Sequence, residues 1–340
     1  MCDMDPLSQA ALGATAAASI CRSSETRYAV LIGALSAASP DLDVMIRSET
    51  DPLLVLDYHR HFTHSIFISP IISLIVAVLF KMLFFRKPWP FRRLLLFAGV
   101  ATLTHGFLDA CTSYGTLLYW PFHDHRESWD IISIIDPIFT LPLVIFTVLS
   151  FTFRRPRFAQ IALIVSASYL CLGLYQRSQA HTFAQVLAES RGHNVDDISV
   201  RPSFGNIILW RLVYRTGETY YVDALRTLPL TEDVHYPGSK VTAFTDQSEI
   251  GVIDFSNQQA KDVERFRFFS QNYLYRHPKH PNVIGDLRYS MFPDSIQPLW
   301  GIRISPDNPD NHISFEYFRD TDTPHLARLL SMIQGKNVPP

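Results

Sequence analysis

The chain has 340 residues and a formal net charge of −2, so it lacks the basic excess expected of a nucleic-acid-binding protein. Its length exceeds the ~100 to 200 residues of a typical single domain, which favours two domains. The four cysteines are scattered and form no CxxC pair, so neither a disulfide framework nor a cysteine zinc site is expected.

Composition divides the chain near residue 175. Residues 1–175 alternate long apolar runs with short basic loops, whereas residues 176–340 contain no run of the roughly 18 to 20 apolar residues that a bilayer crossing needs. We therefore expect a membrane-embedded helical domain over 1–175 and a soluble α+β domain over 176–340. The membrane domain is predicted to be an α-helical bundle of four strong spans plus an N-terminal helical hairpin.

The apolar segments give this bundle its order. Residues 7–20 are rich in alanine, glycine and serine, a composition typical of helices that pack closely in membranes. Together with residues 28–39 they form the predicted hairpin, which is short for a full crossing. The four predicted spans are residues 66–85, 94–110, 131–153 and 158–175.

Basic turns predict the orientation of these spans. Residues 86–93 and 154–157 are rich in arginine and lysine, and short loops of this kind tend to stay in the cytoplasm. The opposite ends of the spans and the second domain are then extracytoplasmic.

The second half contains a predicted β-hairpin. Residues 206–215 and 218–226 are rich in β-branched and aromatic residues and are separated by Thr216-Gly217, which is typical of two strands joined by a tight turn. Further strands are expected over 283–289, 299–305 and 313–318, with helices over 176–192, 263–275 and 324–333.

Histidine and aspartate residues from separate segments are predicted to converge on the extracytoplasmic side. His105 and Asp109 are four apart on a predicted helix, so their side chains share one face. In isolation they could equally form a satisfied polar contact at a helix end. The histidines and aspartates on this side are Asp41, Asp43, His59, His61, His64, His105, Asp109, His123, His125 and Asp136. Imidazole and carboxylate ligands suit zinc, manganese or iron, so a divalent-metal site is expected, with zinc preferred.

An ordered set of short motifs resembles the bacterial membrane-bound metal-dependent hydrolase family, the YdjM-like inner-membrane proteins. The motifs in the first half include Asp5-Pro6-Leu7, Gln9-Ala10, Pro40-Asp41-Leu42-Asp43, Tyr58-His59-Arg60, Thr63-His64-Ser65, His105, Leu108-Asp109, Thr112, Tyr114-Gly115-Thr116, Pro121-Phe122 and Ile135-Asp136-Pro137. In the second half the resemblance continues through Leu209-Trp210-Arg211 and Asp286-Leu287-Arg288-Tyr289.

This resemblance implies metal-dependent hydrolysis, with a His/Asp pattern similar to that of zinc-dependent phospholipase C. The implied metal ligands are Asp41, Asp43, His59, His64, His105 and Asp109, and Asp136 is an implied supporting carboxylate. Two positions depart from the family pattern: His61 stands where the family has glycine, and Gln9 stands where some relatives have histidine. His61 could add a ligand or restrict access, and Gln9 could be a neutral hydrogen-bonding neighbour.

The leading functional hypothesis is a membrane-bound hydrolase of the bacterial inner membrane. Metal-activated water would attack an ester or phosphoester of a lipid-linked or amphipathic substrate, with an aspartate as general base. The catalytic candidates are Asp41, Asp136 and Arg60. Arg60 could bind a substrate phosphate, although an arginine that only anchors a helix at the headgroups fits equally well. Two alternatives are a metal-binding transport or sensing protein and a non-catalytic envelope scaffold with a structural metal.

Overall fold

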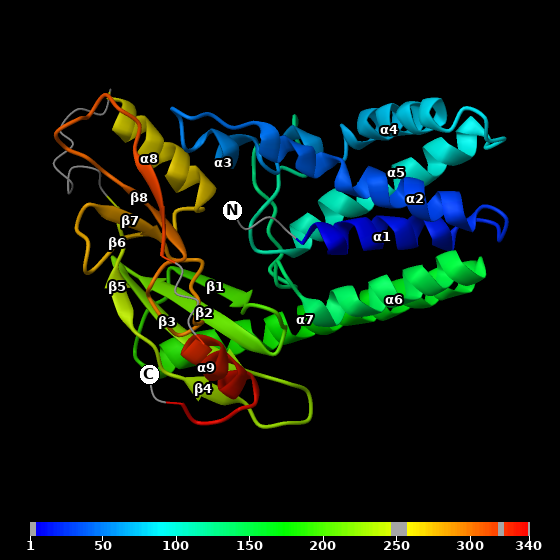
Figure 1. Cartoon of the computed structure of the whole chain (residues 1–340). Helices are drawn as coiled ribbons and strands as arrows, with labels where there is room; N and C mark the ends of the chain where they lie inside the picture. Colours follow the sequence, from blue (N-terminus) through cyan, green and yellow to red (C-terminus); the bar gives the residue numbers. More distant parts are fainter. Residues whose placement is uncertain (1–4, 246–256, 319–322, 339–340) are drawn as a thin grey trace. The chain divides into compact units, whose positions relative to one another are not determined.

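The computed structural model of the chain describes residues 5–245, 257–318 and 323–338 (Figure 1). These residues form two compact units. The helical unit comprises the described residues of Met1–Met45, Tyr58–Leu174 and Phe204–Asn206, and the α+β unit comprises those of Ile46–Asp57, Tyr175–Ser203 and Ile207–Pro340. The chain therefore passes from the helical unit into the α+β unit and back again before residue 60.

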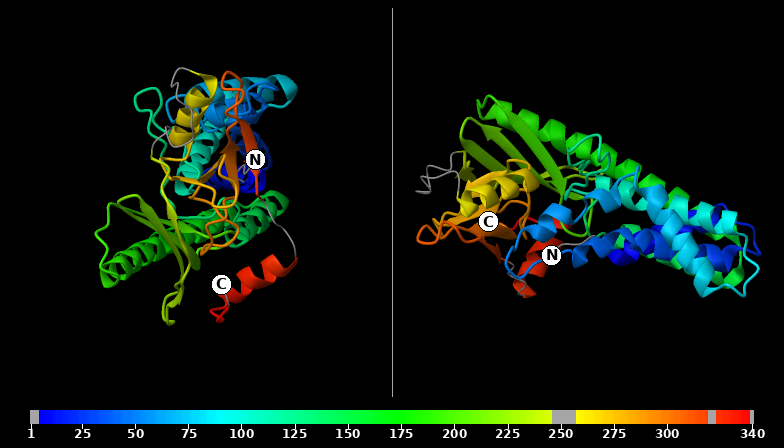
Figure 2. Two further views of the ribbon diagram at one scale, coloured as in Figure 1. Left: turned by 90° about the vertical axis from the view of Figure 1, so that its left-hand side faces the viewer. Right: turned by 90° about the horizontal axis from the view of Figure 1, so that it is seen from above.

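The helical unit is built from α-helices that pack side by side (Figures 1 and 2). Helix α1 contacts α2, α5 and α6, and α5 also contacts α2 and α4. The helices are α1 (Pro6–Ser19), α2 (Thr26–Ala38), α4 (Ser69–Leu83), α5 (Phe91–Cys111), α6 (Pro137–Phe153) and the first part of α7 (Pro156–Ser190). Two 3-10 turns, η1 (Pro40–Met45) and η2 (Phe62–His64), and the short helix α3 (Leu54–Tyr58) lie between α2 and α4 in the sequence.

Small residues bring α1 and α2 into close contact. A Cβ atom added to Gly13 would lie 2.2 Å from Ala37 Cβ and 2.8 Å from the Gly33 carbonyl oxygen. Ala17 and Ala29 are fully buried in the same region. The predicted close packing of the N-terminal hairpin is therefore confirmed, and it depends on the absence of side chains at Gly13 and Gly33.

The number of candidate membrane spans differs from the prediction. By length and composition, Phe91–Cys111 and Pro156–Ser190 can each cross a membrane, and Leu54–His64 with Ser69–Leu83 would form one further span bent by 82°. Helix α6 begins at Pro137 rather than near residue 131, and its 17 residues are short for a crossing of about 20 residues. The described residues thus contain two or three candidate spans, where the sequence predicted four strong ones.

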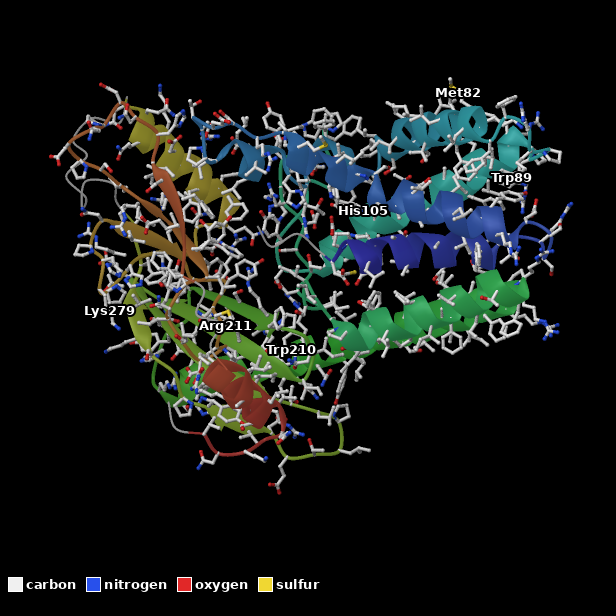
Figure 3. The ribbon with its side chains drawn as sticks, viewed as in Figure 1. Met82, Trp89, His105, Trp210, Arg211 and Lys279 are labelled. Atoms are coloured by element: carbon white, nitrogen blue, oxygen red, sulfur yellow. The ribbon has the colours of Figure 1, made fainter. Side chains whose placement is uncertain are left out.

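Outward-facing apolar side chains agree with a lipid environment for these helices. Met82 lies on the outer surface of α4 and is 66% exposed, whereas His105 lies among the helices (Figure 3). In the apolar part of α7, only 22% of the most hydrophobic window is buried. Apolar side chains that would be unfavourable in water can face hydrocarbon at no cost.

Helix α7 is continuous to Ser190, so the separate helix expected over 176–192 is an extension of the last span. Two antiparallel sheets follow it. The first has the order β1 (Asp197–Pro202), β2 (Leu209–Thr216), β3 (Thr219–Arg226) and β4 (Val234–Tyr236), and β5 (Lys240–Thr242) also pairs with β3. The second has the order β6 (Leu274–Arg276), β7 (Val283–Asp286), β8 (Trp300–Arg303) and β9 (Ser314–Tyr317). Helices α8 (Gln258–Phe269) and α9 (Thr323–Ile333) complete the described elements.

The predicted hairpin forms β2 and β3. Thr216 pairs with Thr219, and Gly217 adopts a φ of 57°, a conformation that glycine reaches without a steric penalty. One core joins the two sheets, because Val213 and Val222 from the first pack with Tyr275 from the second.

Arg211 on β2 has a structural role in this unit. Its guanidinium is buried and donates hydrogen bonds to the carbonyl oxygens of Leu287, Pro293 and Ser295. Burial lowers the pKa of Arg211 to about 10, so the group keeps its charge at neutral pH. In the other motif of the second half, Asp286-Leu287-Arg288-Tyr289, the side chains of Asp286 and Arg288 form a fully buried ion pair of 2.8 Å. The motifs of the second half therefore build the core of the α+β unit.

Candidate metal centre

Four side chains in the helical unit place one ligand atom each within 4.8 Å of one another. They are Asp41, His64, His105 and Asp109. His64 Nε2 lies 3.0 Å from Asp109 Oδ2 and 3.3 Å from Asp41 Oδ1, and His105 Nε2 lies 3.4 Å from each of the same two oxygens. The structure thus brings together four of the six ligands that the sequence predicted.

Helix α5 supplies His105 and Asp109, and its Gly106 allows His64 to approach them. His105 and Asp109 lie on one face of the helix, as their spacing predicted. Gly106 lies between them, and a Cβ atom there would be only 2.4 Å from the carbonyl oxygen of His64. The turn η2 can therefore pack directly against the helix backbone.

Backbone and side-chain contacts orient the α5 ligands. His105 Nδ1 donates to the carbonyl oxygen of Ala37 at 2.5 Å, which directs Nε2 toward the cluster. Gln9 donates to Asp109 Oδ1 at 2.8 Å, which leaves Oδ2 facing the histidines. Partners of this kind fix the ring and carboxylate orientation that a metal ion requires. Gln9 is thus the neutral neighbour that its position in the sequence suggested.

Asp43 and His59, the other two predicted ligands, form a pair next to the cluster. His59 Nδ1 donates to Asp43 Oδ1 at 2.8 Å, and Thr63 donates to Asp43 Oδ2 at 2.7 Å. Asp43 Oδ2 also lies 3.3 Å from His64 Nδ1, on the side of the ring that faces away from the cluster. Asp43 is therefore placed to orient His64. Thr63 belongs to the Thr63-His64-Ser65 motif, but the sequence assigned it no role, and the structure shows that it holds Asp43.

The carboxylates of η1 are held in their charged form. Burial alone would raise the pKa of Asp43, but hydrogen bonds from His59 and His64 hold it well below the ordinary value. Burial likewise opposes ionisation of Asp41, and the charge of His105 with contacts to both cluster histidines lowers the pKa of Asp41 overall. Both groups can therefore act as anionic ligands or ligand partners at neutral pH.

Arg60 and Asp136 lie in different surroundings. Arg60 is fully buried, donates to Thr112 at 2.9 Å, lies 3.5 Å from Asp109 Oδ1 and stacks over the ring of Tyr114. Asp136 caps the N-terminus of α6 by accepting from the amides of residues 138 and 139, and it accepts from the Tyr169 hydroxyl at 2.8 Å. Arg60 is thus a partner of the cluster carboxylate, and Asp136 stabilises a helix end.

Three other histidines that the sequence predicted near the site, His61, His123 and His125, are not among the four clustered residues. His61 packs against the rings of Tyr58, Phe62 and Trp120. His123 and His125 are exposed in the loop after α5. The residue that departs from the family pattern, His61, therefore borders the site as an aromatic contact.

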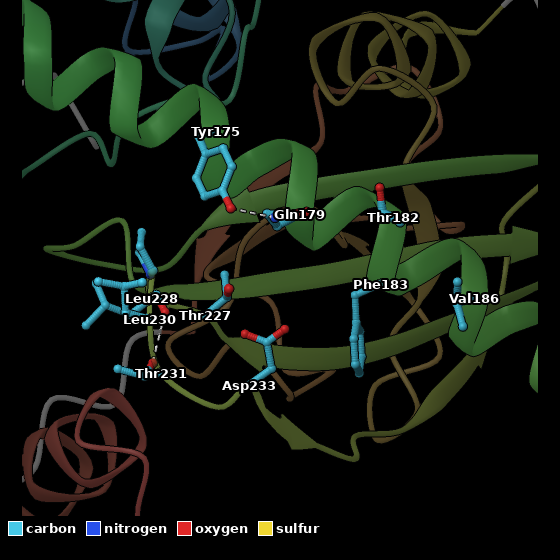
Figure 4. A pocket seen from close by; sticks show the side chains of 11 residues that line it. Tyr175, Gln179, Thr182, Phe183, Val186, Thr227, Leu228, Leu230, Thr231 and Asp233 are labelled. Carbon is cyan, nitrogen blue, oxygen red and sulfur yellow. Dashed lines mark hydrogen bonds between the residues drawn. The ribbon is translucent and has the colours of Figure 1, made fainter.

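A separate pocket of about 450 Å³ lies in the α+β unit (Figure 4). One wall is the second half of α7, where Gln179 donates to the Tyr175 hydroxyl, and the other is the loop 227–233. None of its lining residues is a histidine or belongs to the metal cluster.

Apolar helices around a buried His/Asp cluster define an integral membrane protein with a candidate metal centre. The sequence profile of the YdjM inner membrane protein family matches residues 4–180, and the chain belongs to this family of inner membrane proteins. It is also similar to the uncharacterized protein YfhP of Bacillus subtilis strain 168, with 24% identity over 201 residues. That match covers 57% of this chain and 58% of YfhP. No solved structure matches the chain.

Proposed function

We propose that this protein is a membrane-bound metal-dependent hydrolase that cleaves an ester or phosphoester in a lipid-linked or amphipathic substrate. The observation that carries the proposal is the cluster of Asp41, His64, His105 and Asp109, with four ligand atoms within 4.8 Å. Three of the side chains are fully buried, and that of Asp41 retains 16% exposure.

The donor set fits a divalent metal ion. Two imidazole nitrogens and two carboxylate oxygens are ligands that zinc accepts in tetrahedral sites, and manganese and iron accept the same atoms. Among the described residues, His105 Nε2 and Asp109 Oδ2 are buried without a hydrogen bond. Burying such polar atoms unsatisfied costs free energy, and a bound cation would remove that cost. When bound, the ion would lower the pKa of a water molecule and polarise the scissile group.

We assign the residues of the site distinct roles in this reaction. Asp41 alone among the four is partly exposed, so we assign it as the carboxylate that accepts the proton of the attacking water. Arg60, whose guanidinium lies 3.5 Å from Asp109 Oδ1, would keep the Asp109 carboxylate ionised and oriented. Direct roles of Arg60 and Asp136 in catalysis remain predictions.

The surface beside Asp41 supports an amphipathic substrate. On the same turn η1, Leu42 and Met45 are 64% and 73% exposed. Apolar side chains next to the exposed edge of a polar site suit a molecule with a reacting headgroup and a hydrocarbon portion. This is the arrangement that a substrate embedded in the bilayer would need.

We also propose that the metal centre faces the extracytoplasmic side. The arginines of residues 86–93 precede and begin α5, whereas His105 and Asp109 lie near its other end. Helix α5 has 21 residues and is about 30 Å long, so basic turn and site would lie at opposite membrane surfaces. A topology reporter fused after Pro340 tests this, and a cytoplasmic signal would reverse the assignment.

The function is tested with protein purified in detergent. Metal content is measured first, and release of phosphate or headgroup from a panel of envelope lipids is measured next. We expect stoichiometric metal and a lipid product that His105→Ala abolishes. Stoichiometric metal with no product from any lipid would favour the scaffold with a structural metal. Absence of metal from the wild-type protein would contradict the proposal.

A further inference from the structure

The segment Ile46–Asp57 connects two parts of the metal centre. It begins directly after η1, which carries Asp41 and Asp43, and it ends two residues before His59. The flanking residues on both sides belong to the helical unit, whereas Ile46–Asp57 belongs to the α+β unit. An element that holds this segment therefore restrains the chain where it leaves η1 and where it enters the His59–His64 stretch.

Arg265 on α8 is the principal polar contact of this segment. Its Nε and Nη2 atoms donate to Asp57 Oδ2 at 2.9 and 2.5 Å. Its Nη1 and Nη2 atoms donate to the two oxygens of Asp51 at 3.1 and 2.9 Å. Nη1 also donates to Asp262 Oδ1 at 2.9 Å, so all five N–H groups of the guanidinium are used.

Asp262 anchors this network inside the α+β unit. Its side chain is fully buried and accepts from the His312 ring at 2.8 Å, from the amide of Ile313 at 3.1 Å and from Gln258 at 3.0 Å. The neighbouring residue Phe266 is fully buried as well. The buried Asp262 therefore holds the Arg265 guanidinium in place, and the same guanidinium binds Asp51 and Asp57.

The geometry distinguishes this network from an ordinary surface ion pair. An isolated exposed pair contributes about 0 to 1 kcal/mol, because solvent screens it and two flexible side chains must be ordered. Arg265 instead binds three carboxylates at once, in part by bidentate contacts, and one of the three is fully buried. Such a network restrains a backbone segment as well as contributing energy.

We propose that Arg265 is a positioning residue for the metal centre: by holding Asp51 and Asp57, the α+β unit fixes the segment that joins Asp41 and Asp43 to His59 and His64. This inference rests on the proposed metal centre and adds a role for the α+β unit. Loss of the contact would let the segment sample more conformations, and the ligands on either side would lose part of their preorganisation.

The test compares Arg265→Gln with Arg303→Gln in the full-length protein. Arg303 pairs with Glu316 between β8 and β9 of the same unit, so its variant also loses an ion pair without touching Ile46–Asp57. Zinc affinity is measured by competition with a chelator, and release of the segment is measured by trypsin cleavage after the exposed Arg47. We expect Arg265→Gln to bind zinc about tenfold more weakly and to be cleaved faster after Arg47. Arg303→Gln should match the wild type in both.

The outcomes separate this inference from the proposed function. If wild type binds zinc, His64→Ala does not, and Arg265→Gln matches wild type in affinity and cleavage, the positioning role is wrong while the metal centre stands. If wild type binds no zinc, the metal centre fails, and unchanged cleavage after Arg47 would overturn the anchoring by Arg265 as well. Melting of the metal-free variants checks folding, and Asp57→Asn provides a milder variant that should weaken zinc binding in the same direction.

Discussion

His64 Nε2 lies 3.0 Å from Asp109 Oδ2, which joins the turn η2 to helix α5 across the candidate metal centre. Neither residue is near the other in the sequence. Their contact exists because Gly106 lets the backbone of His64 approach the helix and because Gln9 turns Asp109 Oδ2 toward it.

Removing either cluster histidine should abolish stoichiometric metal binding. His64→Ala or His105→Ala leaves three protein ligands and a buried cavity, which we expect to lower zinc affinity by at least about 100-fold. Metal content after dialysis against a weak chelator measures the effect. His123→Ala changes an exposed histidine of the loop after α5 and should retain the wild-type metal content. Equal metal in all three variants would show that the ion binds elsewhere.

Asp43→Asn should weaken metal binding without eliminating it. The substitution removes the negative charge, which lies 2.8 Å from His59 Nδ1 and 3.3 Å from His64 Nδ1, and it replaces one of the two acceptor oxygens by an NH2 group that can only donate. Loss of an outer carboxylate partner typically costs about 10 to 100-fold in metal affinity. Competition titration with a chelator measures the change, and Asp124→Asn at an exposed position is the matched control. A complete loss of metal would instead assign Asp43 as a direct ligand.

Gly106→Ala should destabilise the protein, whereas Gly99→Ala on the same helix α5 should not. At Gly106 the new methyl group would lie 2.4 Å from the His64 carbonyl oxygen, so we expect about 1 to 3 kcal/mol of destabilisation and weaker metal binding. At Gly99 the nearest atom is Ser73 Oγ at 4.0 Å, so the higher helix propensity of alanine should leave stability unchanged or slightly raised. Thermal unfolding in detergent and metal titration compare the two; a neutral Gly106→Ala would contradict the close packing of η2.

Glu25 should make the helical unit sensitive to acid. Arg93 donates to its carboxylate at 2.5 and 2.9 Å, and the Arg22 amide donates at 2.8 Å. Burial alone would raise the pKa of Glu25, but these hydrogen bonds lower it from 4.5 to about 2. Because the folded protein binds this proton less tightly than the unfolded chain, the contribution is complete above pH 4.5 and is lost as the pH falls toward about 2.

Glu25→Gln should therefore reduce stability most at neutral pH and least in acid. The ion pair is partly exposed, so the expected difference is at most about 1 kcal/mol. Thermal unfolding followed between about pH 3 and about pH 6 should show a flatter dependence on pH for the variant than for the wild type. Glu49→Gln, at an exposed position, should keep the wild-type slope. Parallel curves for Glu25→Gln and wild type would contradict this assignment.

Sequence patterns determined much of the candidate site because its decisive signals are local. The spacing of His105 and Asp109 places both on one helix face, whereas the ligand roles of Asp41 and His64 were implied by the resemblance to the YdjM-like family. The glycine and alanine content of residues 7–20 indicated a closely packed helix, and Thr216-Gly217 indicated the hairpin of β2 and β3. Each of these features depends on residues within one or two turns of the chain.

Long-range contacts decided the rest. The sequence could not divide six implied ligands into the four that meet and the Asp43–His59 pair beside them, because that division depends on how η1, η2 and α5 pack. The sequence could not show that α7 continues unbroken to Ser190 or that α6 starts at Pro137, because apolar content locates the ends of a helix only approximately. Nor did it mark Arg265, whose importance comes entirely from Asp51 and Asp57 more than 200 positions away. Composition and periodicity fix which segments can form a membrane site, and only the packing of distant segments decides which atoms meet there.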